Sequence, residues 1–156
     1  MDGPLVGTAV GKPRPVLAPL VSSYTGYRME GAQPGVHRGL PSRHLTFIVT
    51  LDGAVDLAVM PDPTQPPASF TTLVGGLHST PALIRHDGHQ HGIQLNLTPL
   101  GARALLRRTA GELASTVVEL STLLGPVAVN LSSDCGQHAR GPIVSSSWTC
   151  SIPIRM

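Results

Sequence analysis

The sequence predicts an α+β protein in which a small antiparallel β-sheet or barrel is followed by short helices. Residues 45–59 and 82–97 alternate apolar and polar side chains, which is typical of half-buried strands. The apolar period becomes helical only after Thr98. The 17 Gly and 15 Pro among 156 residues favour turns and short elements over long helices. Because the strands precede the helices instead of alternating with them, α+β is favoured over α/β.

The first forty residues contain few regular signals. Residues 1–23 are rich in Pro, Gly and Val without a clear period, so we expect an extended arm or a first edge strand. Residues 30–41 hold three Gly and two Pro, which predicts a loop.

Two Asp-Gly dipeptides predict two tight hairpins. Asp52-Gly53 separates the alternating residues 45–51 from 55–59, and Asp87-Gly88 separates 82–86 from 89–97. Asp-Gly favours hairpins because it supplies the positive φ angles of a tight turn. A further strand is expected at residues 70–74.

Three helix starts follow the strands. Thr98 is a candidate N-cap with Pro99 at the first helical position. Thr109 and Glu112 have the spacing of a capping box. A third helix is expected after Ser121, its apolar stripe formed by Leu123, Leu124, Val127, Ala128 and Leu131.

Composition excludes several functions. Hydrophobic residues are 41% of the chain, enough for one core, and charged residues are only 13%. A net charge of +2 is too small to indicate a general nucleic-acid binder. One Trp, two Tyr and two Phe provide no clustered platform for stacking bases. The sequence also lacks a Gly-x-Ser-x-Gly elbow and a P-loop.

Localisation follows from similar reasoning. Cys135 and Cys150 are too few for a disulfide framework and do not have zinc-site spacing. The most apolar run near the start, residues 15–21, contains two prolines and is too short for a secretory core or a membrane span. We therefore expect a cytoplasmic protein with no membrane contact.

Several motifs occur in a characteristic order. They are Tyr-Arg-Met-Glu-Gly at 27–31, Pro-Gly-Val-His-Arg-Gly-Leu-Pro-Ser at 34–42, the strand and Asp-Gly at 45–53, Val-Gly-Gly-Leu at 74–77, Gly-Ile-Gln-Leu at 92–95, Leu-Thr-Pro-Leu-Gly-Ala-Arg at 97–103 and Gly-Glu-Leu at 111–113. In this order and spacing, residues 24–131 resemble the N-terminal domain of actinobacterial AraC-type transcriptional regulators. The resemblance implies a β-rich, often cupin-like domain that senses an effector or dimerises, joined to a C-terminal pair of helix-turn-helix units that binds DNA.

The chain departs from that plan after residue 131. Residues 132–156 form an irregular tail with no period, too short for two helix-turn-helix units. We therefore expect the DNA-binding half to be absent, so that no residue of this chain binds DNA and DNA is reached only through a missing C-terminal domain. The change of composition at Ser132 also suggests a shifted reading frame, and a truncated product without function is a further possibility.

Candidate effector-binding residues are His37, Arg38 and Arg43. They gather within residues 34–44, where a loop could bind an anionic effector or a phosphate. In the alternative interpretation this loop is simply solvated, and its arginines pair with Glu30 or Asp52.

Candidate metal ligands are His86, His89 and His91. On the expected hairpin His86 and His89 would lie opposite each other, with His91 on the same face as His89. Three imidazoles so placed could hold Zn²⁺ or another divalent metal. In the alternative interpretation, they form an exposed hairpin tip.

The favoured function is therefore the sensor and dimerisation domain of an AraC-like regulator. It is expected to be no enzyme, to need no cofactor, to form a homodimer and to bind a small-molecule effector. The rival function is a stand-alone cupin-like metal-binding protein or enzyme that uses the three histidines.

Overall fold

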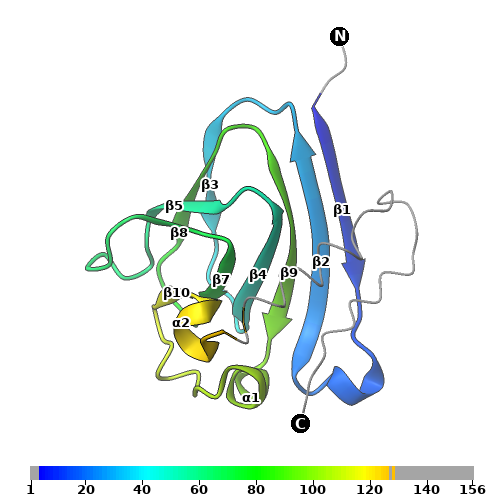
Figure 1. Ribbon diagram of the computed structural model, residues 1–156, viewed down its shortest axis with the longest axis vertical. Coiled ribbons are helices and arrows are strands. Elements are labelled where there is room, and N and C mark those ends of the chain that lie inside the picture. Colours follow the sequence, from blue (N-terminus) through cyan, green and yellow to red (C-terminus); the bar gives the residue numbers. More distant parts are fainter. Residues whose placement is uncertain (1–3, 127, 129–156) are drawn as a thin grey trace.

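The computed structural model describes residues 4–126 and 128, and these residues form two antiparallel β-sheets with a few short helices (Figure 1). The larger sheet has six strands in the order β1 (Leu5–Gly11), β2 (Val21–Glu30), β9 (Gln90–Leu97), β4 (Leu45–Asp52), β7 (Thr72–Gly75) and β10 (Val117–Glu119). The smaller sheet has four strands in the order β3 (Gly35–Gly39), β8 (Ala82–His86), β5 (Val55–Val59) and β6 (Ala68–Phe70). The prediction of a small antiparallel sheet protein with short helices is confirmed. Within 1–23, the edge-strand interpretation is correct for β1.

The helical segments are single turns. They are η1 (Pro15–Leu17), α1 (Pro99–Gly101), the π-helical turn η2 (Ala102–Leu106) and α2 (Leu120–Leu124). The predicted cap at Thr98 is present, because its hydroxyl oxygen accepts a hydrogen bond from the Gly101 N–H at 3.0 Å. Throughout residues 4–126, no helix combines the length and apolar character required to cross a membrane.

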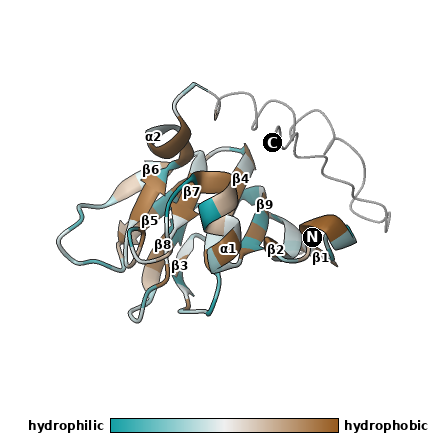
Figure 2. Cartoon of the chain, turned by 90° about the horizontal axis from the view of Figure 1, so that it is seen from below, coloured by the Kyte–Doolittle hydropathy of each residue, from teal (hydrophilic) through white to brown (hydrophobic). Residues whose placement is uncertain are grey.

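A first core fills the space between the two sheets. Its buried side chains are Ile48, Leu73 and Val117 from the larger sheet, Val55, Leu57, Phe70 and Ala82 from the smaller sheet, and Met60. A second core lies on the opposite face of the larger sheet, where the strands meet the helical turns. It includes Leu45, Phe47, Val49, Val74, Ile93, Leu95 and Leu97 together with Ala102, Leu106 and Leu120. In Figure 2 the hydrophobic residues gather in α2 and the strands near it.

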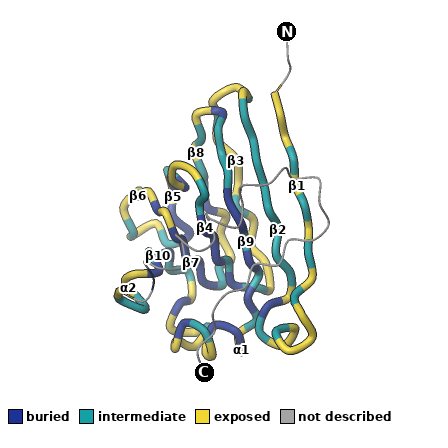
Figure 3. The backbone as a smooth tube through the Cα atoms, turned by 45° about the vertical axis from the view of Figure 1, so that its right-hand side comes forward, coloured by how far each residue is buried: buried dark blue, intermediate teal, exposed yellow. Residues whose placement is uncertain are grey.

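The larger sheet is therefore buried on both faces at its centre. Phe47, Ile48 and Val49 are three consecutive buried residues of β4, and they alternate between the two cores. Figure 3 shows the same pattern: burial concentrates in the middle strands, and β1 at the edge is largely exposed.

The two predicted hairpins are wrong. β4 and β5 belong to different sheets, and so do β8 and β9. Gly53 and Gly88 do adopt positive φ angles, 72° and 100°, but the turn they make carries the chain from one sheet to the other. β4 pairs with β7 on one side and with β9 on the other. Its side chains are buried on both faces of the sheet, so the burial of these faces, and not the turn alone, determines which strands pair.

The loop predicted for residues 30–41 contains a strand. β2 extends to Glu30, and β3 pairs with β8. Gly39 serves close packing rather than a turn, because a Cβ at this position would lie 3.3 Å from Ile84 Cδ1.

The later helix predictions are correct in part. Thr109 and Glu112 make the reciprocal capping contacts: the Glu112 carboxylate accepts from the Thr109 N–H at 2.7 Å, and the Glu112 N–H donates to the Thr109 hydroxyl at 3.2 Å. No helix follows, because the Ser115 N–H donates to the Leu77 carbonyl at 2.7 Å and draws the chain toward β10. The third helix is α2, which ends at Leu124; Val127, Leu131 and the predicted tail 132–156 lie outside the described residues.

Candidate functional site

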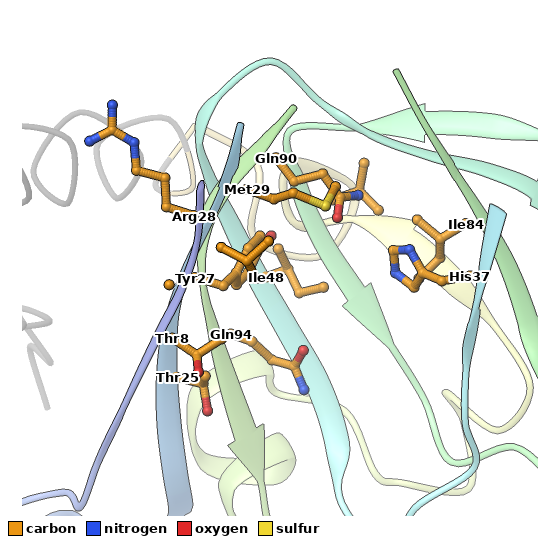
Figure 4. A pocket seen from close by; sticks show the side chains of 13 residues that line it. Thr8, Thr25, Tyr27, Arg28, Met29, His37, Ile48, Ile84, Gln90 and Gln94 are labelled. Atoms are coloured by element: carbon orange, nitrogen blue, oxygen red, sulfur yellow. The ribbon is translucent and has the colours of Figure 1, made fainter. Parts of the chain in front are cut away.

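A cavity of about 320 Å³ opens between the two sheets. This volume is at the lower end of the roughly 300–1,000 Å³ typical of small-molecule pockets. The larger sheet contributes Val6, Gly7, Thr8, Thr25, Tyr27, Arg28, Met29, Ile48, Gln90 and Gln94, and the smaller sheet contributes His37, Val55 and Ile84. In Figure 4, His37 and Ile84 point from the smaller sheet toward Met29 and Gln90.

Strand register explains which side chains face the cavity. Thr8 pairs with Tyr27, and Tyr27 pairs with Gly92, so the tyrosine ring lies across the centre of three adjacent strands. Gly92 is required there, because a Cβ would collide with the Tyr27 hydroxyl. Burial raises the pKa of Tyr27 to about 12. The phenol therefore remains protonated, and it can donate a hydrogen bond at ordinary pH.

The lining is mostly apolar, with several neutral polar groups and one arginine, Arg28, which is paired with Glu30. Val6, Ile48, Val55 and Ile84 provide apolar surface, and Gln90 and Gln94 bring amides. Among the described residues that line the cavity, none is Asp or Glu. The Gln94 amide donates to Asn96 at 3.1 Å, and the Asn96 amide donates to Ser23 at 3.0 Å, so part of this polar row is already held in place.

The imidazoles of His37 and His86 form a pair on the smaller sheet. Their ring centroids are 5.6 Å apart with an interplanar angle of 39°. The pair arises because Gly35 is opposite His86, so that His37, two residues further on, lies diagonally across on the same face. The His86 ring lies directly against Gly35, where a Cβ would be 3.4 Å from Nε2, an ordinary van der Waals contact.

The two imidazoles differ in their surroundings. Nδ1 of His86 is buried and has no hydrogen-bond partner among the described residues. The pKa of His37 lies below its ordinary value, first because burial disfavours the charged ring and second because a charged His86 would repel it.

The structure brings only one of the three predicted effector residues to the cavity. His37 lines it, whereas Arg38 is the next residue of β3 and therefore faces the opposite side. Arg43 is exposed in the bend before β4. The alternative pairings with Glu30 and Asp52 are also not those formed, because Glu30 pairs with Arg28 at 2.6 Å and Asp52 with His89 at 3.0 Å.

The three predicted metal ligands are not brought together. His86 lies beside His37 on the smaller sheet, and His89 lies in the crossover with its Nε2 3.0 Å from Asp52 Oδ2. His91 is opposite Arg28 on the helix-side face of the larger sheet. The predicted metal site required a hairpin at Asp87-Gly88, but the chain passes there from the smaller sheet to the larger one. Within residues 4–126, no group of three or more His, Cys, Asp or Glu is placed to hold a metal.

His91 belongs to a charged group with Arg28, Glu30, Asp52 and His89. Its pKa is lowered mainly by burial and then by the positive charge of Arg28, while Asp52 and Glu30 act in the opposite direction. Apart from Arg28, none of these residues is among those that line the cavity.

Sequence reasoning did not find the His37–His86 pair. The alternation of Gly35, His37 and Gly39 with Val36 and Arg38 was the available signal for β3, but the glycines and prolines around it favoured a loop.

No protein-family model matches the chain, and no curated protein or solved structure is significantly similar to it.

Proposed function

We propose that this chain is the effector-sensing and dimerisation domain of an AraC-like transcriptional regulator. In this proposal the two sheets, β1 included, form a cupin-like sensor that acts in the cytoplasm without catalysis and reaches DNA through a domain outside this chain. The observation that carries the proposal is the cavity between the two antiparallel sheets. Its apolar walls, with a few convergent polar groups, have the chemistry of a small-molecule binding site.

The position of β1 supports a link between ligand and partner. Val6 and Thr8 line the cavity, while β1 is also an edge strand of the larger sheet in the described part of the chain. A ligand that contacts this strand can change how the edge is presented, which shifts the population of a state that binds a partner.

The edge itself supports homodimer formation. β1 has no charged residue and no proline, and Leu5, Val6 and Val10 are 54%, 65% and 74% exposed. Edge strands of soluble proteins are usually protected by charges, prolines or cover, and an unprotected edge is a template for pairing with another strand.

Ligand binding tests the proposal directly. We would screen the full chain against a library of small metabolites by thermal unfolding, together with Ile84→Trp, which fills the cavity, and Leu100→Trp, a matched change at an exposed position. We expect compounds that stabilise the native chain and Leu100→Trp but not Ile84→Trp.

The regulatory part needs a second readout. The chain would be fused to a DNA-binding domain that represses a reporter only as a dimer, and a stabilising compound should change repression. If no compound stabilises the chain, or if the Ile84→Trp variant binds the compounds equally well, the proposal is wrong.

A further inference from the structure

We propose that His37, which lines the cavity, and His86, which packs against His37 without being among the lining residues, together form the polar end of the cavity, and that the ligand is a small carboxylate with an apolar body. The inference rests on the proposed function in one respect, that the cavity binds a small molecule. It adds the chemical class of the ligand and the two side chains that recognise it.

The unpartnered nitrogen of His86 is the first observation. Nδ1 is buried and has no hydrogen-bond partner within the described part of the chain, although buried polar atoms in folded proteins are nearly always paired. A ligand oxygen at this position would supply the missing partner. Neither Arg38 nor Arg43 is among the lining residues, and the Tyr27 hydroxyl and the Gln90 and Gln94 amides belong to the larger sheet, so the imidazoles are the donors at the smaller-sheet end.

The geometry of the pair is the second observation. The two rings lie on one face of the sheet with centroids 5.6 Å apart, a separation that a single carboxylate could bridge. A carboxylate has two oxygens and accepts from several donors, and its bonds to imidazoles become charge-assisted when either ring is protonated. A neutral hydroxyl or amide ligand has a single oxygen and no charge, so it would form fewer and weaker hydrogen bonds with the two histidines.

The surrounding charges favour an anion over a cation. No Asp or Glu is among the described lining residues, so a carboxylate meets no repulsion within the cavity. Arg28 is the only charged residue among the described lining residues, whereas Arg38 and Arg85 lie on the opposite face of the smaller sheet from the paired histidines. Arg85 is partly compensated by Asp56 at 3.4 Å. A divalent metal would need further ligands, and the described residues provide no third His, Cys, Asp or Glu beside the pair.

The rest of the cavity defines the body of the ligand. Val55 and Ile84 of the smaller sheet line the same cavity as His37, and Ile48 and Met29 line it from the larger sheet. Figure 4 shows Ile84 beside His37, with Ile48 and Met29 across from them. A cavity of about 320 Å³ has room for a short alkyl chain or one aromatic ring. The carboxylate at the histidines and the hydrocarbon against these side chains would together fill the site.

Matched acids and amides provide the test. We would measure binding of hexanoate, hexanamide, phenylacetate and phenylacetamide to the full chain by isothermal titration calorimetry at neutral pH. Acid and amide differ in charge and hardly in shape, so their ratio reports recognition of the carboxylate. We expect at least one acid to bind tenfold or more tightly than its amide, and inorganic phosphate, which has no apolar body, not to bind.

Variants assign the effect to the pair. His37→Gln and His86→Phe should each reduce the preference for acid over amide to less than threefold, whereas His44→Gln, on an exposed segment before β4, should retain it. Circular dichroism and thermal unfolding confirm that each variant is folded, and two independent variants guard against the failure of one. In histidine-selective nuclear magnetic resonance spectra, the acid should shift the imidazole nitrogens of residues 37 and 86 and leave that of residue 44 in place.

The alternative outcomes are distinct. Equal binding of acid and amide, abolished by Ile84→Trp, overturns the carboxylate and leaves the proposed function intact. Binding of Zn²⁺ or Ni²⁺ that His86→Phe removes, without binding of any acid, shows that the pair is a metal site. If neither the acids nor any library compound binds, both proposals fail.

Discussion

His86 lies in the smaller sheet, and its buried Nδ1 atom makes no hydrogen bond to any described residue. A buried polar atom without a partner costs roughly 1–3 kcal/mol of stability. Replacing the ring by one that is similarly shaped and apolar removes this cost and keeps the contact with His37.

We therefore predict that His86→Phe raises the free energy of unfolding by about 1 kcal/mol. Urea-induced unfolding at neutral pH measures it. His78→Phe is the control, since the Nδ1 of His78 is 2.6 Å from the Thr80 carbonyl oxygen and its replacement should lower stability. A loss of stability in His86→Phe would show that Nδ1 has a partner in solution. A gain in stability accompanied by loss of carboxylate binding is the signature of a site that sacrifices stability for function.

His37 predicts a pH dependence of stability. Its pKa in the folded chain is below the ordinary value of about 6.5, so the unfolded chain binds the proton more readily. Full stability is therefore present above about pH 6.5 and is lost as the pH falls through the lowered folded pKa. His91 acts in the same direction.

We expect the unfolding midpoint in urea to fall between about pH 7.5 and 5.5, and His37→Phe to reduce that fall. The depressed pKa values of Asp62 and Glu112 contribute at lower pH, because carboxyl groups ordinarily titrate near pH 4. An unchanged profile in His37→Phe would contradict the assignment, and His44→Gln serves as the control.

At the scale of single elements, the two Asp-Gly crossovers are built alike but surrounded differently. Both glycines have positive φ, 72° at Gly53 and 100° at Gly88. A Cβ on Gly53 would meet nothing within 4 Å, whereas one on Gly88 would collide with the carbonyl of Ala32. The Ala32 N–H also donates to the Gly88 carbonyl at 3.2 Å, so this crossover is attached to the segment between β2 and β3.

Gly53→Ala should cost about 1 kcal/mol, the strain of a left-handed backbone alone. Gly88→Ala should cost about 3 kcal/mol, because backbone must also move away from the new methyl group. Urea unfolding of the two variants side by side measures the difference. Equal losses would mean that Ala32 and Gly88 are not in contact.

Local sequence signals predicted the individual strands and caps, but they did not predict which strands pair. The alternation in β4, β5, β8 and β9, the Thr98 cap and the Thr109–Glu112 contacts were all visible in the sequence. A positive φ at Asp-Gly specifies a sharp turn, but it does not state whether the next strand lies beside the last one or in another sheet. That choice depends on which faces must be buried, and Phe47, Ile48 and Val49 in succession were the indication that β4 is covered on both sides.

The candidate site was predictable to the same limited degree. His37 was predictable as a binding residue because residues 34–44 are rich in His and Arg. The structure places it in the cavity lining. The pairing of His37 with His86 was not predictable, because the sequence placed His86 in a hairpin with His89 and that hairpin does not form. Contacts across strands that are distant in sequence require the topology first.

For the whole molecule, the free edge of the larger sheet determines how copies can associate. We predict that the chain forms dimers through β1 and that Val10→Lys shifts it to monomer. Lysine on an edge strand prevents continued pairing. Val10 does not line the cavity, so ligand binding should persist in the variant.

Size-exclusion chromatography with light scattering, over a range of concentrations, measures the change. Val16→Lys is the control, since Val16 is as exposed as Val10 but lies on η1 outside the strand. Dimers that persist in Val10→Lys, or their loss in Val16→Lys, would place the interface elsewhere.

The order of strands in the larger sheet also has a consequence for how the chain reaches its native state. β1 and β2 are neighbours in sequence and in space, and β4 and β7 pair across an intermediate distance, but only β9 joins these two halves. Chains dominated by such non-local pairings fold slowly, and synthesis proceeds from the N-terminus. Residues 90–97 must therefore leave the ribosome before the two halves can become one sheet, and until then the backbone N–H and C=O groups along the facing edges of β2 and β4 lack their partner strand.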